Sequence, residues 1–341
     1  MRSAGLIGEF GMKIIHGLGG IPHGRPRPIA TIGNFDGVHI GHQKLINDVV
    51  RRASGSGGTP TVVAFHPHPL QVLAPDNAPR MLQTLRQRLS AFEALGVQLA
   101  VILHFDQAFA RVSAWDFAVR MLWHQLDLQE IYVGPSFAFG YRREGSFNLL
   151  KEMGEQQGFM VGKIAQVQFR GSRVSSTAVR QALMTGQVAL VRRLLGRPYA
   201  LEGEIVHGAA IGSGIRVPTA NLRTDNELIP RKGVYVTRMT VDGETCPGVT
   251  NIGVRPTVVI SPAEPDLSVE THLLDFEGDL YGREVALEFL LRLRDEKRFP
   301  DKTALAAQIH KDIGRARRYF RWLAKTGAAS RPPWPCKFSE V

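Results

Sequence analysis

The pattern of hydrophobic and polar positions divides the chain into two halves. In residues 28–196, short apolar runs alternate with segments whose apolar positions recur every three or four residues. Runs at 28–32, 61–65, 99–103 and 131–133 predict buried strands, and segments near 40–50, 82–95 and 117–126 predict amphipathic helices. This alternation predicts a parallel sheet with helices on both faces, in which ligands bind beyond the carboxyl ends of the strands.

From residue 200 the apolar positions alternate in period two, with glycine-rich turns between them. This pattern predicts a small antiparallel barrel with strands at 203–207, 233–241, 248–252, 268–276 and 284–291. Residues 276–282 are expected to form a hairpin connection, and residues 303–322 a closing helix. The predicted organisation is therefore an N-terminal extension (1–27), an α/β domain (28–196), a barrel domain (200–323) and a disordered tail (324–341).

The most informative stretch is GNFDGVHIGHQ at residues 33–43, between the first predicted strand and the first predicted helix. Free backbone N–H groups and the helix dipole make such a junction a natural phosphate site. His39 and His42 are expected to donate hydrogen bonds to nucleotide phosphates, and Gly41 lets the backbone approach them closely. The H-x-G-H pattern indicates nucleotidyl transfer, although class I aminoacyl-tRNA synthetases contain the same letters.

Two later stretches extend this interpretation. The hydroxyls of VSSTAVRQAL (174–183) predict a capped helix start, and Arg180 in its first turns suggests an anionic ligand there. The loop VGPSFAFG (133–140), followed by arginines, has two interpretations: a holder for a flat ring carrying phosphate, or a loop anchored in the core by its aromatic residues. His66 and His68 lack a third nearby ligand in the sequence, so we expect no metal site there.

Composition adds constraints rather than a function. The formal net charge of +11 favours an anionic partner, and residues 315–321 carry a basic cluster. A solvated basic surface explains this balance more simply, so we expect no nucleic acid and no membrane as partners. No apolar run has the length of a membrane span. The two cysteines, Cys246 and Cys336, lie far apart in no metal-binding pattern, which suits a reducing cytoplasm.

Taken in order, GNFDGVHIGHQ, VGPSFAFG and VSSTAVRQAL resemble the adenylyltransferase domain of prokaryotic bifunctional riboflavin kinase/FAD synthetases. The second half resembles their riboflavin kinase domain through EGEIVHG, VPTANL, KGVYV, GVTNIGVRPT, VETHLLDFEGDLYG and RLRDEKRF. The resemblance covers residues 28–322 and implies a Rossmann-like α/β nucleotidyltransferase domain followed by a riboflavin-kinase-like barrel. It implies two reactions: riboflavin and ATP give FMN and ADP, and FMN and ATP give FAD and pyrophosphate.

The resemblance also implies site residues. In the first half, the implied ATP-binding residues are Gly33, Asn34, Phe35, Asp36, His39, His42, Ser175, Ser176, Thr177 and Arg180. The implied flavin-binding residues there are Ser136, Phe137, Phe139 and Arg143. In the second half, Glu270 matches the general base, and Gly208, Gly212, Pro218, Thr219 and Asn221 match the ATP-binding residues. His39, His42, Arg180 and Glu270 are the implied catalytic residues, and Thr219 and Asn221 the implied Mg²⁺ ligands. Asp36 is expected to support the loop or magnesium rather than to act as a base.

Two departures from the family pattern leave alternatives open. Ser213 and Arg216 occupy places where the family usually has arginine and glycine, and Ser136 replaces an aspartate or asparagine. One alternative is therefore an FAD synthetase with an impaired kinase domain; others are a different H-x-G-H adenylyltransferase and a basic nucleic-acid-binding protein. We expect a cytoplasmic monomer or weak oligomer whose partners are riboflavin, FMN and ATP.

Overall fold

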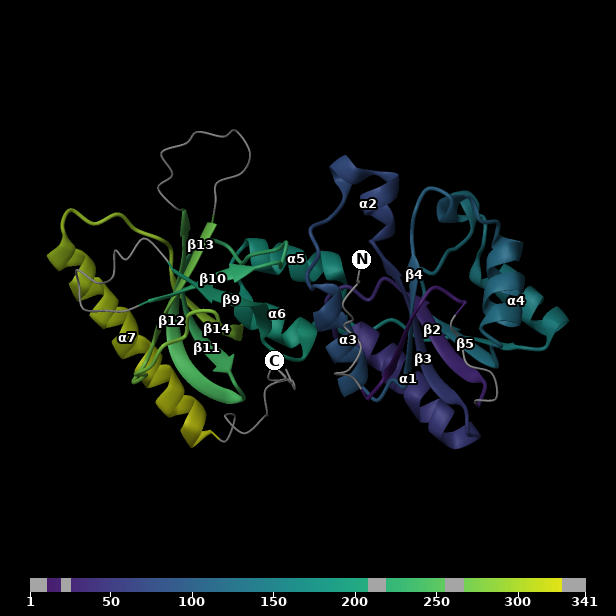
Figure 1. Cartoon of the computed structure of the whole chain (residues 1–341), viewed down its shortest axis with the longest axis horizontal. Coiled ribbons are helices and arrows are strands. Elements are labelled where there is room, and N and C mark those ends of the chain that lie inside the picture. The colour runs from purple at the N-terminus through teal and green to yellow at the C-terminus, as the bar shows by residue number, and fades with distance from the viewer. Residues whose placement is uncertain (1–10, 20–25, 208–218, 255–266, 327–341) are drawn as a thin grey trace. The chain divides into compact units, whose positions relative to one another are not determined.

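The computed structural model describes residues 11–19, 26–207, 219–254 and 267–326 (Figure 1). The chain forms two compact units, Met1–Ser176 and Thr177–Val341, and each is described by itself. The predicted site residues Gly208, Gly212 and Pro218 lie outside the described residues, as does the predicted tail from residue 327 on. The tail prediction is wrong for residues 324 and 325, which are the last residues of the final helix. Ser213 and Arg216 lie outside them as well.

The first unit contains a six-stranded sheet in which every pair of neighbouring strands is parallel, as predicted. The strands are β1 (Lys13–His16), β2 (Pro28–Gly33), β3 (Thr59–His66), β4 (Leu99–His104), β5 (Glu130–Val133) and β6 (Met160–Lys163), in the order β1-β4-β3-β2-β5-β6. Strand β1 was not predicted; it lies within residues 1–27 and pairs with β4. The order reverses at β2, so β2 and β5 are neighbours at the topological switch point, where ligands bind in such sheets.

The helices of this unit follow the strands in alternation. They are α1 (Ile40–Ser56), α2 (Pro69–Leu73), α3 (Leu85–Ala94), η3 (Asp116–Gln125) and α4 (Phe147–Gln157), with 3₁₀ turns η1 (Pro75–Asn77), η2 (Phe109–Arg111) and η4 (Tyr141–Arg143). A short hairpin, β7 (Gln168–Phe169) and β8 (Ser172–Arg173), precedes α5 (Ser176–Met184). The helix predicted near 117–126 is present as the π-helix η3.

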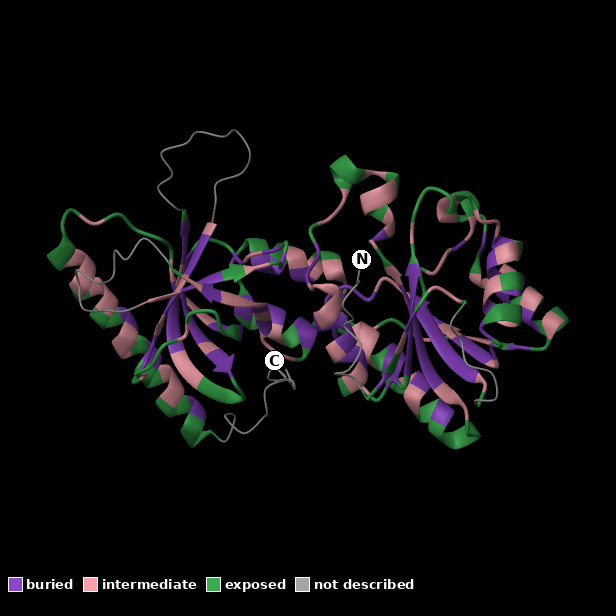
Figure 2. Cartoon of the chain, viewed as in Figure 1, coloured by how far each residue is buried: buried purple, intermediate pink, exposed green. Residues whose placement is uncertain are grey.

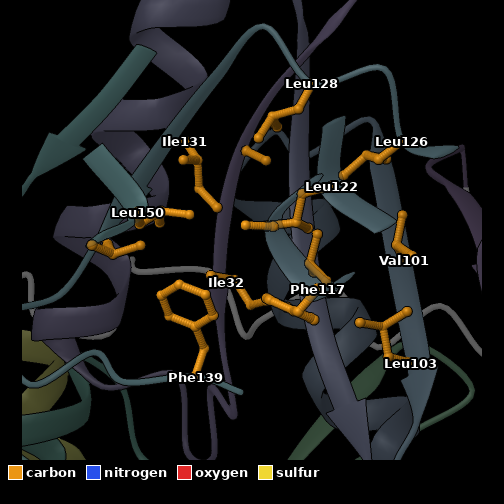
Figure 3. Packing of buried hydrophobic residues seen from close by; sticks show 14 of the residues in the cluster. Ile32, Val101, Leu103, Phe117, Leu122, Leu126, Leu128, Ile131, Phe139 and Leu150 are labelled. Carbon is orange, nitrogen blue, oxygen red and sulfur yellow. The ribbon is translucent and has the colours of Figure 1, made fainter. Parts of the chain in front are cut away.

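The core of the first unit lies between the sheet and the helices η3 and α4 (Figure 3). Ile32 and Ile131 from the neighbouring strands β2 and β5 contribute to it, as do Phe117 and Leu122 from η3. Phe139, from the loop after β5, packs in the same cluster, with its ring centroid 5.7 Å from that of Phe117. The core therefore reaches directly beneath the loops that follow β2 and β5.

The second unit is a closed six-stranded antiparallel barrel, as the period-two pattern predicts. Its strands are β9 (Tyr199–Val206), β10 (Ala220–Thr224), β11 (Gly233–Val241), β12 (Glu244–Val254), β13 (Leu267–Leu273) and β14 (Glu284–Arg294), in the order β10-β13-β12-β11-β14-β9. The helices are α6 (Val188–Leu195) and α7 (Lys302–Lys325). Figure 2 shows that the buried residues gather on the central strands β2, β3 and β4 of the first unit and on β11 and β14 of the barrel.

Two details of the barrel correct or extend the prediction. Residues 276–282 do not form a hairpin connection, because β13 pairs with β10 and β12 whereas β14 pairs with β11 and β9. The turn-rich letters mark a connection but cannot identify which strands it joins. The predicted helix at 303–322 is α7, which begins at the cap Asp301 and packs Ala316 against Val234 and Val236.

Candidate active sites

The H-x-G-H stretch lies at the carboxyl end of β2, where the chain enters α1. His39 is the N-cap of α1, and its Nδ1 accepts a hydrogen bond from the backbone N–H of His42 at 3.2 Å. The two imidazoles are stacked, with ring centroids 3.7 Å apart. A Cβ on Gly41 would lie only 3.1 Å from Cε1 of His39, so this glycine also makes room for the cap. His39 therefore serves the helix start with one nitrogen, whatever its other nitrogen binds.

His42 has a buried nitrogen without a protein partner. Among the described residues, its Nδ1 makes no hydrogen bond. Burial, and secondarily the neighbouring His39, holds the pKa of His42 well below its ordinary value. His42 is therefore neutral at pH 7 and can donate only one hydrogen bond. Phe35, itself buried, supports it edge-on at a centroid distance of 5.2 Å.

Asp36 faces inward rather than toward a ligand. Its carboxylate accepts the backbone N–H of Leu82 at 3.0 Å and that of Gln83 at 3.2 Å, and the residue is only 2% exposed. Its main-chain carbonyl accepts a hydrogen bond from Ser176 Oγ at 2.8 Å. This agrees with the expectation that Asp36 supports the loop, and it joins the SSTAVR helix start to the turn after β2.

The residues around the start of this helix are divided between the two compact units. Helix α5 begins at Ser176, as the hydroxyl-rich capping pattern predicts. Thr177, which is exposed, and the partly buried Arg180 belong to the second unit, whereas Ser175 belongs to the first. The hydrogen bond from Ser176 to Asp36 thus links the two predicted phosphate-binding elements.

Beside the turn, the loop after β3 is connected to the loop after β2. The Asn34 amide nitrogen lies 3.0 Å from Nε2 of His68, and Nδ1 of His68 accepts the backbone N–H of Leu70. His68 thereby caps α2 with one nitrogen and contacts Asn34 with the other. Arg88, from α3, donates to the carbonyl of Asn34 at 2.9 Å and was not singled out by the sequence.

The loop after β5 carries the predicted flavin-binding residues. Phe139 is buried and Phe137 is stacked on it, with centroids 5.3 Å apart. Ser136 Oγ accepts a hydrogen bond from Arg173 at 3.0 Å. Arg143 is exposed and has a left-handed backbone, with a φ of 63°. Phe139 thus anchors the loop in the core, which leaves Ser136, Phe137 and Arg143 as the more accessible of the predicted residues.

In the second unit, polar residues line up across three adjacent strands. Asn221 on β10 lies opposite Glu270 on β13, which in turn lies opposite Asn251 on β12. Opposite residues on neighbouring strands share a face of the sheet, so Glu270 is flanked by two amides. Thr219 directly precedes β10 and is partly buried. The predicted base Glu270 and the predicted magnesium ligand Asn221 therefore lie in one row, and Thr219 lies two residues before Asn221 along the chain.

The sequence did not single out Asn251 or Arg88. Asn251 lies within the quoted GVTNIGVRPT stretch, and its register with Glu270 appears only once the strands are paired. Arg88 falls on the apolar stripe of its helix, three residues after Leu85 and four before Phe92, where a solvent-facing residue is not expected. An arginine on an apolar stripe is the signal that could have identified it.

Comparison with known proteins gives concordant matches for the two halves. A family model described as FAD synthetase matches residues 23–178, and one described as riboflavin kinase matches residues 195–320. Neither the impaired-kinase alternative nor the nucleic-acid-binding alternative is favoured by these matches. Among the described residues, every helix is too short or too polar to cross a lipid bilayer.

Curated relatives match nearly the whole chain. A bifunctional riboflavin kinase/FMN adenylyltransferase of Pseudomonas fluorescens is 40% identical over 306 residues, covering 90% of this chain and 97% of the relative. The Escherichia coli K12 protein of the same description is 39% identical, covering 91% and 98%. A crystal structure from Streptococcus pneumoniae, described as a macrolide-efflux protein, is similar with a TM-score of 0.80 and 26% identity, covering 90% of this chain and 98% of that one.

Proposed function

Because the chain belongs to the bifunctional riboflavin kinase/FMN adenylyltransferase family, we propose that its two units divide two flavin reactions between them. The protein is a riboflavin kinase and an FMN adenylyltransferase. It converts riboflavin and ATP to FMN and ADP, and FMN and ATP to FAD and pyrophosphate. What remains to be assigned is which residues carry out each step.

Adenylyl transfer is assigned to the switch point of the parallel sheet. The observation that supports this is that the H-x-G-H turn and the VGPSFAFG loop follow β2 and β5, which are adjacent strands. An oxygen of the FMN phosphate attacks the α-phosphorus of ATP, and the bond to the departing pyrophosphate breaks. That phosphate oxygen is already anionic at neutral pH, so no general base is needed.

Catalysis in this unit then rests on positioning and on donors to the developing charge. His42 contributes as a neutral donor, and the N–H groups at the start of α1 add positive potential. Arg180, which follows the first unit on α5, is assigned as the cation on the family resemblance alone, and Ser136, Phe137 and Arg143 are assigned to hold the flavin. The remaining residues assigned to the ATP subsite are Gly33, Asn34, Phe35, Asp36, Ser175, Ser176 and Thr177. Of these, Asp36 and Ser176 act through hydrogen bonds to other protein groups.

Phosphoryl transfer to riboflavin is assigned to the row of polar residues on the barrel. The ribityl hydroxyl is a poor nucleophile while it is protonated, so it benefits from a base, and we assign to Glu270 the role of accepting its proton. Asn221 and Asn251 lie opposite Glu270 on the neighbouring strands, and we assign to their amides the role of orienting that carboxylate. The Thr219 hydroxyl and the Asn221 amide oxygen are hard oxygen donors of the kind that suits Mg²⁺, which neutralises charge on the ATP phosphates when bound.

We also propose that the adenylyltransferase domain ends near residue 196 and the kinase domain near residue 323, and that residues 1–27 form an extension that contributes β1. The protein acts in the cytoplasm, as a monomer or weak oligomer, without nucleic acid as a partner.

A product assay on two single variants tests the assignment. Purified protein with MgATP receives either riboflavin or FMN, and the flavins are separated by chromatography. His42→Ala should form FMN from riboflavin but no FAD, whereas Glu270→Gln should form FAD from FMN but no FMN from riboflavin. Each variant's retained activity is the control that the chain is folded. If either single change removed both activities in a folded protein, the assignment to two sites would be wrong.

A further inference from the structure

Arg88 on α3 is a buried cation that the proposed chemistry does not use. Its exposure is 2%, and arginine is seldom buried to that extent without close partners. Its Nη1 donates to the main-chain carbonyl of Asn34 at 2.9 Å and to that of Phe65 at 3.3 Å, and its Nη2 lies 3.4 Å from Nδ1 of His66. In the described part of the chain its Nε has no hydrogen-bond partner. The guanidinium is therefore fixed by backbone and imidazole.

These contacts fasten the carboxyl ends of two neighbouring strands. Asn34 is the first residue after β2, and Phe65 is the penultimate residue of β3, which pairs with β2. The amide of Asn34 in turn contacts His68, the cap of α2. One guanidinium thus holds the starts of the loops after β2 and β3 at the edge of the sheet where ATP is proposed to bind.

We propose that Arg88 is a positioning residue for adenylyl transfer, which sets the place of Asn34 and of the GNFDG turn against the ATP phosphates. The inference rests on the proposed assignment of that turn to ATP. The planar fork of arginine reaches two carbonyls and an imidazole at fixed angles, which the single ammonium of lysine cannot reproduce. Burial without its hydrogen bonds would cost free energy, so the contacts are expected to be rigid.

The test compares Arg88→Met and Arg88→Lys with Leu89→Ala. Leu89 is the next residue on the same helix and is 6% exposed, so its truncation destabilises the same part of the unit without removing a contact to Asn34 or Phe65. FAD formation from FMN is measured with ATP and FMN varied in turn, well below the unfolding midpoint of every variant. FMN formation from riboflavin is measured on the same samples.

Both Arg88 variants should lose about 10- to 100-fold in kcat/KM for ATP, with the KM for FMN and the kinase rate unchanged. Leu89→Ala should keep the wild-type kcat/KM. The inference would be overturned if the Arg88 variants had the same kcat/KM for ATP as the wild type. It would also be overturned if Leu89→Ala lost as much kcat/KM for ATP as the Arg88 variants do. If Arg88→Met does not fold, Arg88→Lys decides. A wild-type protein that makes no FAD would instead overturn the assigned adenylyl-transfer function, and this inference with it.

Discussion

Substituting Asp36 distinguishes a structural carboxylate from a catalytic one. Its two oxygens both lie 3.0 Å from the backbone nitrogen of Leu82, and Oδ1 lies 3.2 Å from that of Gln83. Asp36→Ala leaves these two N–H groups without their acceptor. Each hydrogen bond to a buried charged group contributes about 1.5–3 kcal/mol, so losing two should lower the free energy of unfolding of the first unit by about 3–6 kcal/mol.

Asp36→Asn should cost less, about 1–2 kcal/mol, because the amide oxygen still accepts one N–H while the negative charge near Arg88 is lost. With a urea m-value of about 2 kcal/mol/M, the unfolding midpoint should decrease by about 2 M in the alanine variant. In the asparagine variant it should decrease by less than about 1 M. The midpoints can be read from the urea concentration at which FAD formation is lost after pre-incubation. The loss of FMN formation in the same samples reports the second unit, which should not shift.

Catalysis gives the refuting result. In folded Asp36→Asn, kcat for FAD formation should stay within about threefold of wild type, since the FMN phosphate needs no base. A general base normally contributes about 10²–10⁴-fold. A loss of that size in Asp36→Asn with an unchanged urea midpoint would show that the carboxylate acts on the substrate, and the reasoning from its hydrogen bonds would be wrong.

Three further outcomes follow from particular contacts. Because the folded-state pKa of His42 is depressed, its contribution to stability is complete above the unfolded pKa of about 6.5 and is lost as pH falls below it. The urea midpoint of the first unit should therefore drop between pH 7.5 and 5.5, and less steeply in His42→Leu; equal slopes would contradict this. Ser176→Ala removes the 2.8 Å hydrogen bond to the carbonyl of Asp36 and should lower the rate of FAD formation by about tenfold at an unchanged kinase rate. A wild-type rate of FAD formation in this variant would show that the start of α5 does not contribute to adenylyl transfer. Glu288→Gln removes the buried carboxylate that pairs with the partly buried Arg238 and should destabilise the barrel by about 3 kcal/mol, read as an earlier loss of riboflavin phosphorylation in urea; an unshifted loss would mean that the pair adds no stability.

The fold could be predicted from the sequence where burial is periodic. Four of the six parallel strands and all but one of the barrel strands follow from apolar runs or from period-two alternation. β1 (Lys13–His16) contains only two consecutive apolar residues between polar ones, so no apolar run marks it, and it is placed by pairing with β4. β10 (Ala220–Thr224) is mostly polar and is stabilised by ladders with β9 and β13 rather than by its own hydrophobicity. The strand order that brings β2 beside β5 is likewise a property of pairing, which local pattern does not specify.

The residues of the candidate site could be identified from the sequence motifs. Which of them contact a ligand and which only support the others could not. Phe35, Asp36 and His39 were all expected to bind ATP, yet each is buried and contacts neighbouring protein groups: His42, the 82–83 backbone and the start of α1. A motif match alone does not distinguish the residues that contact a ligand from the residues that position them. Burial and hydrogen-bond direction make that distinction.

The two units should also differ in how strongly substitutions of supporting residues affect their activities. In the first unit, a turn of five residues must hold a stacked imidazole pair at a helix start, and the buried carboxylate of Asp36 and guanidinium of Arg88 fix it from below. In the barrel, Glu270 projects from a strand that is hydrogen-bonded on both sides, so the ladder itself supplies the rigidity. Substitutions beneath the site should therefore impair adenylyl transfer more readily than kinase activity. The kinase should be sensitive mainly to Glu270 and to the residues of its own row.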